Sequence, residues 1–297
     1  MEKITLTFLG TGNAVPTPKR NHTAMLLTYK NENILIDCGE GTQRQFKIAH
    51  LSANKISRLL LTHMHGDHVL GIPGLFQTLK MNDYSKVLEV YGPRGTERFI
   101  DGIEQLFKIK IKTPVNEVFS KFHEADDFYL EAAPMKHDAP CNAYSFIIKD
   151  KYRLDPAKLK KLKLPNSPIL KKLQAGEDIA FEGKKIKASQ VSYLEKGRKI
   201  TFILDTAYNE TAIELAKDSD ILVCEASFSN EEKTLAEERM HLTAEQAATI
   251  AKKANVGKLI LTHISQRYEH NPKIILEEAK RVFKNVTLAK DLDVVEF

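Results

Sequence analysis

The sequence predicts an α/β protein in which two β-sheets pack face to face and helices cover their outer faces, an αββα sandwich. Four short apolar runs, rich in Ile, Leu and Val, each lead into a histidine or an acidic residue. None of them alternates between apolar and polar residues, which is typical of strands buried on both faces. The runs are residues 59–61 before His63, 200–204 before Asp205, 221–224 before Glu225 and 259–262 before His263. We expect a single domain over residues 1–297, because no low-complexity linker and no clear internal repeat divides the chain.

The other expected elements fit the same architecture. Further strands are expected in the N-terminal half, at residues 3–9, 23–29, 33–37, 86–91, 115–121, 127–133 and 143–149. Helices are expected at residues 96–107, 210–217, 243–254 and 272–283. Strands gathered in one half and helices placed between the later strands favour two packed sheets with helices outside.

Residues 151–173 differ from the rest of the chain in charge. They hold eight basic side chains and one acid, a net charge of +7, which leaves −2 for the remainder of a chain whose net charge is +5. Such a concentration of positive charge in one segment indicates a polyanionic partner. The side chains expected to bind that partner are Lys158, Lys160, Lys161, Lys163, Lys171 and Lys172.

The same segment predicts two short helices. Asp155 followed by Pro156 is a helix start, and Ser167 followed by Pro168 repeats it, while Gly176 is a helix-terminating residue. Helices of about two turns are not stable alone in water. We therefore expect an inserted, protruding helical arm over residues 151–176. Its expected packing residues are Leu159, Leu162, Ile169 and Leu173. The alternative is an ordinary surface helical hairpin with a solvated lysine face.

Composition limits the remaining possibilities. The chain is 42% hydrophobic and 28% charged, which is ordinary for a soluble globular protein. No apolar run approaches the ~20 residues that span a bilayer, and the N-terminus lacks the layout of a signal peptide. The three cysteines, Cys38, Cys141 and Cys224, form no C-x-x-C pair. We therefore expect a reducing, cytoplasmic location without disulfides, thiolate zinc sites or membrane contact.

The segment 62–68 is the strongest functional signal in the chain. It places three imidazoles and one carboxylate, those of His63, His65, Asp67 and His68, within six positions at the end of an expected strand. Imidazole and carboxylate groups at this density indicate a site for zinc, or for manganese or iron. His137, Asp205 and His263 follow other expected strands and bring the candidate ligands to seven.

Seven ligands exceed the three or four that one tetrahedral zinc takes. They suffice for two ions, with Asp205 as the natural bridging carboxylate. Two ions ~3.5–4 Å apart can hold a hydroxide between them and clamp both oxygens of an in-line phosphoryl displacement.

Glu225 and His241 form a second group of candidates. Cleavage of a phosphodiester needs a proton for the departing oxygen, and an imidazole held by a carboxylate is suited to deliver it. The alternative is structural: His241 caps the helix that opens at Thr243, and Glu225 pairs with a surface lysine.

Five sequence segments together resemble one known family. They are residues 8–12 with Pro16, Thr17, Arg20 and Asn21, then residues 37–45, 65–75, 241–248 and 261–268. These segments are similar to those of the metallo-β-lactamase superfamily, and within it to the ribonuclease Z family of tRNA 3′-processing endonucleases. The likeness runs nearly from end to end of the chain. It departs from the family pattern in the arm, where Pro165 to Pro168 stand in place of a Gly-Pro pair, and at Ala143, Ala207 and Leu242.

The resemblance implies specific roles for the candidate residues. His63, His65 and His137 would hold one zinc, and Asp67, His68 and His263 the other, with Asp205 bridging. Asp67 would also act as the base on the attacking water, and Glu225 and His241 would assist the leaving oxygen. The implied reaction is cleavage of precursor tRNA after the discriminator nucleotide, leaving a 3′ hydroxyl. The family usually works as a homodimer whose arm grips the tRNA elbow from across the interface.

Two other functional classes remain open from the sequence. A small-molecule phosphodiesterase, or another hydrolase of the same fold, needs the metal site but no cationic arm. An RNA-binding protein with a dead site needs the arm but no metal. The intact set of candidate ligands argues against the second alternative.

Overall fold

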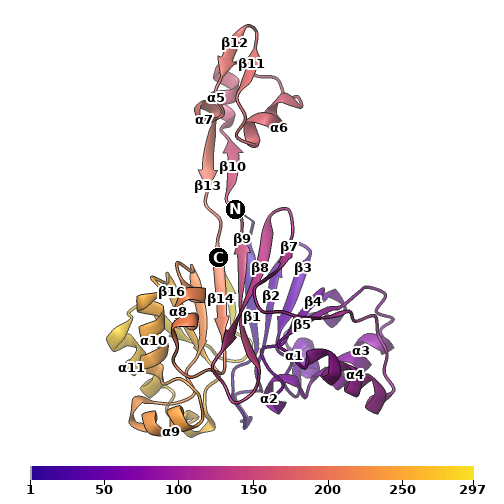
Figure 1. Ribbon diagram of the computed structural model, residues 1–297, viewed down its shortest axis with the longest axis vertical. Helices are drawn as coiled ribbons and strands as arrows, with labels where there is room; N and C mark the ends of the chain where they lie inside the picture. The colour runs from indigo at the N-terminus through magenta and orange to yellow at the C-terminus, as the bar shows by residue number, and fades with distance from the viewer. Residues whose placement is uncertain (1) are drawn as a thin grey trace.

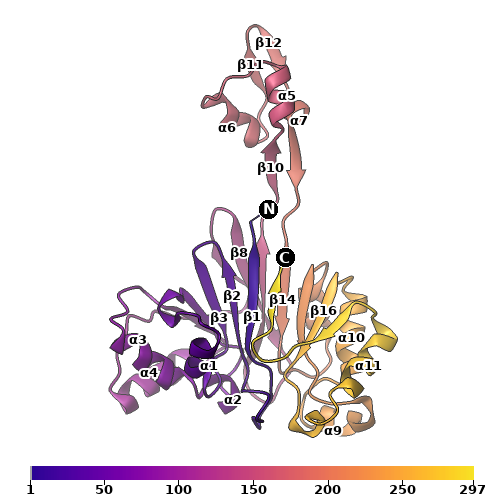
Figure 2. The same cartoon turned by 180° about the vertical axis from the view of Figure 1, so that it is seen from behind.

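The computed structural model describes residues 2–297 and consists of two seven-stranded β-sheets packed face to face, with helices outside and an arm at one end (Figures 1 and 2). The first sheet has the order β18 (Val294–Glu296), β1 (Ile4–Gly10), β2 (Ala24–Tyr29), β3 (Glu32–Ile36), β4 (Arg58–Leu60), β5 (Glu89–Gly92) and β6 (Val115–Glu117). The second sheet has the order β17 (Val286–Leu288), β16 (Lys258–Thr262), β15 (Ile221–Glu225), β14 (Lys199–Ile203), β9 (Cys141–Ile148), β8 (Phe128–Met135) and β7 (Lys121–Glu124). The predicted αββα architecture is confirmed.

Both sheets combine an antiparallel part with a parallel part. The pairs from β3 to β6 are parallel in the first sheet, and those from β14 to β17 are parallel in the second. Parallel strands need crossover connections, which place helices on the outer faces. The main ones are α1 (Thr42–Ile48), α3 (Ile72–Met81), α4 (Thr96–Phe107), α8 (Glu210–Ala216), α10 (Ala244–Lys253) and α11 (Lys273–Val282), with the shorter α2 (Gly66–Val69) and α9 (Lys233–Glu238). The four predicted helices correspond to α4, α8, α10 and α11.

Apolar side chains fill three layers. Phe8, Tyr29, Phe146 and Phe202 belong to the layer between the sheets, and two further clusters lie under the helices on either side. The four apolar runs form β4, β14, β15 and β16, whose residues are nearly all buried. Burial on both faces explains why these runs show no polar alternation.

The predicted strand at residues 115–121 is wrong as a single element. Residues 115–117 form β6 at the edge of the first sheet, and β7 begins at Lys121 in the second sheet. Residues 118–120 therefore carry the chain from one sheet to the other. The sequence shows a continuous strand-like pattern here because only residues 118–120 separate the two short strands.

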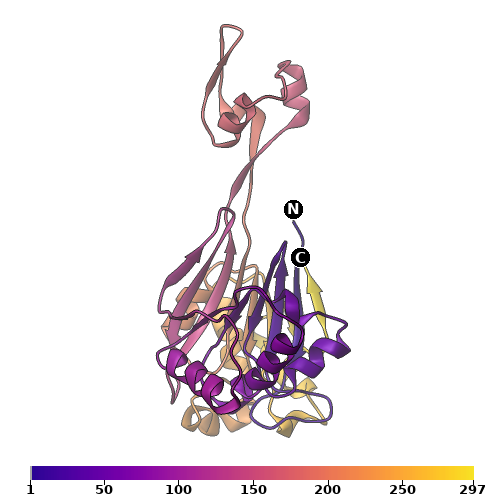
Figure 3. The same ribbon diagram turned by 90° about the vertical axis from the view of Figure 1, so that its right-hand side faces the viewer.

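The protruding arm is larger than predicted and only partly helical. Its stalk is the antiparallel pair of β10 (Lys151–Leu154) and β13 (Ser192–Glu195). Its head contains α5 (Pro156–Lys161), α6 (Ile169–Gln174), β11 (Ile179–Phe181), β12 (Lys184–Ile186) and α7 (Ala188–Val191). The arm thus runs to Glu195 rather than ending at residue 176, and it stands away from the sandwich in every view (Figure 3).

The head of the arm has its own small apolar cluster. Leu173, Ile179 and Val191 are buried in it, and Leu159 and Ile169 pack against it. Leu162 is 40% exposed, so its predicted packing role is wrong. Asp155 caps α5 as predicted, with its Oδ1 accepting from the backbone N–H groups of Ala157 and Lys158. The helices need residues 177–191 to cover their apolar faces.

No helix within residues 2–297 combines the length and the apolar character that crossing a membrane requires.

Gly71 fixes the segment that carries the metal motif against the loop after β3. Its N–H donates to the carbonyl of Cys38 at 2.9 Å, and a Cβ at this position would overlap the carbonyl oxygen of Gly39. We expect Gly71→Ala to lower the free energy of unfolding by about 1–3 kcal/mol, because the obstacle is backbone that cannot rotate away. Urea denaturation measures this.

Gly74→Ala, one turn further along α3, is the matched control. A Cβ at Gly74 would approach only the end of the flexible Gln43 side chain, at 2.9 Å. Alanine is also the better helix former. A neutral or slightly stabilising effect is expected, and equal destabilisation by both substitutions would contradict the argument.

Candidate metal centre

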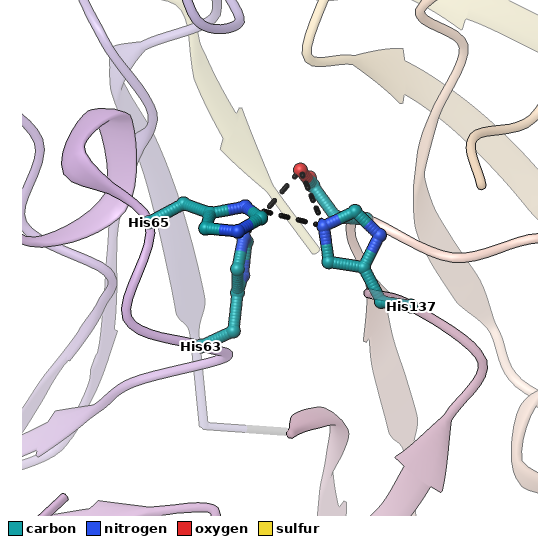
Figure 4. Close-up of side chains that lie close together, drawn as sticks. His63, His65 and His137 are labelled. Carbon is teal, nitrogen blue, oxygen red and sulfur yellow. Dashed lines mark hydrogen bonds and ion pairs between the residues drawn. The ribbon is translucent and has the colours of Figure 1, made fainter. Parts of the chain in front are cut away.

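The seven predicted ligands lie together at one edge of the two sheets, where β4, β8, β14 and β16 end. Parallel strands present their carboxyl ends at a common edge, so side chains that follow them converge there. Figure 4 shows the rings of His63, His65 and His137 pointing toward one another across this edge. The donor atoms form two groups, which share Asp205.

The first group contains His63, His65, His137 and Asp205. Nε2 of His137 lies 3.2 Å from Nδ1 of His65 and 3.8 Å from Oδ2 of Asp205. Nε2 of His63 lies 3.6 Å from the same Asp205 oxygen. Three ring nitrogens and one carboxylate oxygen thus surround one point.

The second group contains Asp67, His68, His263 and Asp205. Nε2 of His263 lies 3.2 Å from Nε2 of His68, 3.3 Å from Oδ2 of Asp67 and 3.1 Å from Oδ1 of Asp205. Asp205 therefore turns Oδ2 toward the first group and Oδ1 toward the second. One carboxylate therefore offers an oxygen to each of the two groups of donor atoms.

The donor atoms fit a divalent metal and little else. Nε2 of His63 and Oδ1 of Asp205 are buried without a hydrogen-bond partner, an arrangement that costs free energy unless an ion satisfies them. Burial lowers the pKa of His63 well below its ordinary value and keeps the ring neutral, the form that binds metal. Burial opposes the charge of Asp205, but the surrounding histidines outweigh it and lower the pKa of this carboxyl well below its usual range. The residues thus form a divalent metal site.

A shell of hydrogen bonds orients the ligand rings. The buried carboxylate of Asp37 accepts from Nδ1 of His68 at 2.6 Å and from the N–H and hydroxyl of Thr62 at 2.7 and 2.8 Å. Nδ1 of His137 faces the carbonyl oxygen of Met240 at 3.3 Å. Such contacts fix which ring nitrogen is free for the metal.

Sequence reasoning missed two carboxylates at the site. Asp37 was visible as an acid that ends an apolar strand, but its contact with His68 joins residues 31 positions apart and has no sequence signal. Asp138 is exposed and lies 3.1 Å from Nε2 of His137 and 3.4 Å from Nε2 of His65. The sequence feature that could have identified Asp138 is its position directly after the candidate ligand His137.

Glu225 and His241 form the predicted pair next to the two groups. Nδ1 of His241 lies 3.1 Å from both oxygens of the buried Glu225, whose Oε1 also accepts from the N–H of Thr206 at 2.8 Å. Burial disfavours the charged form of His241, but the carboxylates of Glu225 and Asp205 outweigh it and raise its pKa to about 9. His241 is therefore an imidazolium at neutral pH, with Nε2 3.9 Å from Oδ2 of Asp205.

The structural alternative for this pair is wrong. The N-terminus of α10 is capped by Thr243, whose hydroxyl accepts from the N–H of Gln246 at 3.2 Å, so His241 is not the cap. Among the described residues, Glu225 pairs with His241, Thr206 and Ser227 and with no lysine.

The six candidate lysines of the arm lie far from this centre. Cys141 at the start of β9 contacts the carbonyl of Asp205 at 3.3 Å, while the other end of β9 leads into the arm. A strand of eight residues spans roughly 25 Å, so the arm begins at the opposite end of the sandwich. All six lysines are exposed, and only Lys158 has an ion-pair partner within the described chain, Asp155 at 3.8 Å.

Comparison with known proteins places the chain in a family. The family model described as Anti-Pycsar protein Apyc1 matches residues 4–154, and the beta-lactamase superfamily domain matches residues 180–264. A ribonuclease Z of Methanosarcina acetivorans is 37% identical, covering 97% of this chain and 96% of that protein. The chain belongs to the ribonuclease Z family. A ribonuclease Z of Nanoarchaeum equitans is 35% identical, covering 97% of this chain and 92% of that protein.

Solved structures agree with this placement. The short form of human tRNase Z matches with a TM-score of 0.71 and 26% identity, over 98% of each chain. A metallo-beta-lactamase fold protein of Bacillus subtilis matches with a TM-score of 0.73 over 100% of each chain, at 20% identity, which shows the fold alone. The predicted metallo-β-lactamase fold and the predicted ribonuclease Z family are both confirmed. The ribonuclease Z relatives match across both sheets and the arm, whereas each of the two family models covers only part of the chain.

Proposed function

We propose that this chain is a metal-dependent endoribonuclease that removes the 3′ trailer from precursor tRNA and leaves a 3′ hydroxyl on the tRNA. One observation carries the proposal: the carboxylate of Asp205 is shared by two groups of ligands, and the pair formed by Glu225 and His241 lies beside them. The chain that holds this arrangement belongs to the ribonuclease Z family. This set of groups is suited to hydrolysis of a phosphodiester.

We infer that the site holds two zinc ions, with manganese or another divalent ion as a substitute. The ligands would be His63, His65 and His137 for one ion, Asp67, His68 and His263 for the other, and Asp205 for both. Bound divalent ions would polarise the phosphate and make water a stronger nucleophile.

The side chains of this chain supply the proton transfers. Burial alone would raise the pKa of Asp67, but the contacts with the rings of His263 and His68 outweigh it and lower that pKa, so Asp67 is a carboxylate that can accept the proton of the attacking water. The oxygen of that water forms a bond to phosphorus, while the bond between phosphorus and the 3′ oxygen of the tRNA breaks. His241 gives its Nε2 proton to this departing oxygen, and Glu225 holds the ring through Nδ1. The trailer leaves with a 5′ phosphate.

We expect His241→Ala to lower kcat on precursor tRNA by about 10²–10⁴-fold, the usual contribution of a positioned acid. Metal content should remain unchanged, because His241 lies outside both four-residue groups that share Asp205. Rapid-quench assays and metal analysis measure the two quantities. His50→Ala, at an exposed histidine after α1, is the control, and an unchanged kcat in His241→Ala would remove the residue from the mechanism.

The arm is proposed to bind the tRNA backbone through Lys158, Lys160, Lys161, Lys163, Lys171 and Lys172. Transfer RNA is a shaped polyanion, and proteins recognise such RNA largely through backbone and form. Because the arm begins at the end of the sandwich opposite the metal centre, we infer a homodimer in which the arm of one subunit serves the site of the other. We expect the enzyme to act in the cytoplasm.

The deciding experiment incubates the purified, metal-loaded protein with a precursor tRNA that carries a 3′ trailer and maps the cut. A single cut after the discriminator nucleotide with a 3′ hydroxyl supports the proposal. Hydrolysis of a small chromogenic phosphodiester without any cleavage of the precursor would instead favour a small-molecule phosphodiesterase.

A further inference from the structure

Ser227 connects the two chemical parts of the site, and we propose that it is a positioning residue for both. Its hydroxyl lies two residues beyond the end of β15 and is fully buried. Oγ is 2.7 Å from Oε2 of Glu225, 2.9 Å from Nδ1 of His263 and 3.0 Å from the carbonyl oxygen of His263. One side chain therefore contacts a metal-ligand ring and the carboxylate that holds His241.

The direction of these hydrogen bonds follows from the groups involved. A hydroxyl has one proton to donate, and the ionised carboxylate of Glu225 can only accept. The bond to Glu225 is the shortest of the three and is assisted by charge, so the Ser227 proton points mainly there. Nδ1 of His263 then carries the proton that donates to Oγ. The result is a continuous path from His263 through Ser227 to Glu225 and on to His241.

This path decides which nitrogen of His263 faces the metal centre. With a proton on Nδ1, the lone pair lies on Nε2, the atom that approaches Asp67, His68 and Asp205. His263 also has a φ of +57°, a conformation that is uncommon outside glycine. Since the backbone does not favour this position by itself, the contacts of its ring and carbonyl with Ser227 help to keep the ring aimed at the centre.

The same hydroxyl limits the orientation of Glu225. This carboxylate accepts from the N–H of Thr206, from Ser227 and from Nδ1 of His241. Glu225, His241 and His263 also bring three possible metal donors close together. The hydrogen bonds already satisfy Glu225, however, so this third grouping needs no ion and is better described as the support of the proton donor.

The test compares Ser227→Ala with Ser227→Thr in the full-length protein, using Co²⁺ titrations of the metal-free form. Loss of the hydroxyl should weaken Co²⁺ binding by about 10-fold or more, as for other residues that orient metal-bound histidines. It should also change the visible Co²⁺ spectrum and lower kcat on precursor tRNA with little effect on KM. Threonine retains the hydroxyl and should restore all three quantities to near wild-type values.

Ser229→Ala is the matched control. Ser229 is buried two residues further along. Its backbone N–H donates to the hydroxyl of Tyr268 at 2.8 Å and its carbonyl accepts from the N–H of Glu232 at 3.1 Å, but its own hydroxyl makes no hydrogen bond within residues 2–297. This variant should bind Co²⁺ as the wild type does. Should Ser227→Ala fail to fold, Ser227→Cys replaces it, because the thiol is similar in size but a weak donor.

Wild-type Co²⁺ affinity and spectrum in a folded Ser227→Ala or Ser227→Cys variant would overturn the proposal. So would a folded Ser227→Thr variant that behaves like alanine. The kcat part of the test rests on the proposed function, whereas the Co²⁺ part does not. If the wild-type protein left precursor tRNA uncut, the titrations would still decide the role of Ser227.

Discussion

Asp205→Ala is expected to remove bound metal and to abolish cleavage of precursor tRNA. Oδ1 of Asp205 lies 3.1 Å from Nε2 of His263, and its Oδ2 lies 3.6 Å from Nε2 of His63, so a single substitution takes a ligand from both groups. It also removes a buried negative charge next to the ring nitrogens of His63, His68 and His263. We expect Asp205→Ala to remain folded, because the side chain is at the edge of the sheets and outside the apolar clusters. A loss of activity would then report on the site and not on unfolding.

Metal analysis after dialysis and a single-turnover cleavage assay measure the two effects. Asp138→Ala is the control, since Asp138 also lies within 4 Å of two ligand histidines but is largely exposed and belongs to neither four-residue group. We expect that control to retain metal and most of its activity. Full activity in Asp205→Ala would refute the bridging role, and equal losses in both variants would show that the effect is not specific to the carboxylate that the two groups share.

The candidate site was predictable because its signals are local. His63, His65, Asp67 and His68 lie within six positions, and Asp205 and His263 each follow an apolar run that had to be a buried strand. The carboxyl ends of parallel strands lie at the same edge of a sheet, so the ligands that follow these strands lie close together. This could be predicted without knowing the conformation of the loops. The fold class follows from the same runs.

The parts that could not be predicted depend on contacts between distant residues. Whether residues 115–121 form one strand or two depends on which sheet edge each half pairs with. Ser227 and Asp37 gain their roles from His263 and His68, which are 36 and 31 residues away. A serine or an aspartate in a loop has no pattern that reveals such a partner.

The arm was also predicted only where its sequence signals are local. The charge of residues 151–173 and the cap at Asp155 are local and predicted both its place and its first helix. Leu173 is buried by Ile179 and Val191, which come from a short hairpin and a one-turn helix that follow. Short exposed strands with lysine-rich sequence carry little periodic signal, so the second half of the arm was missed.

Removal of the arm is expected to raise the KM for precursor tRNA by at least about 10-fold while sparing turnover of a small chromogenic phosphodiester. The deletion should cover residues 151–195, because removing 151–176 alone would leave Ile179 and Val191 without the buried Leu173. The two ends are already close: the N–H of Gly197 donates to Oδ1 of Asp150 at 2.7 Å. An Asn-Gly turn between Asp150 and Lys196 therefore closes the gap with little strain.

Salt dependence separates binding by charge from a general effect of the deletion. Each lysine that contacts a phosphate should contribute about one to the slope of log affinity against log salt, so the deletion should flatten that slope. The matched variant keeps the arm and replaces Lys158, Lys160, Lys161, Lys163, Lys171 and Lys172 by glutamine. If the lysines make the contacts, this variant should reproduce most of the change in KM and slope with an intact fold. Equal losses on the precursor and on the small phosphodiester would count against a binding arm, since the metal centre lies at the other end of the sandwich and should not sense the arm's removal.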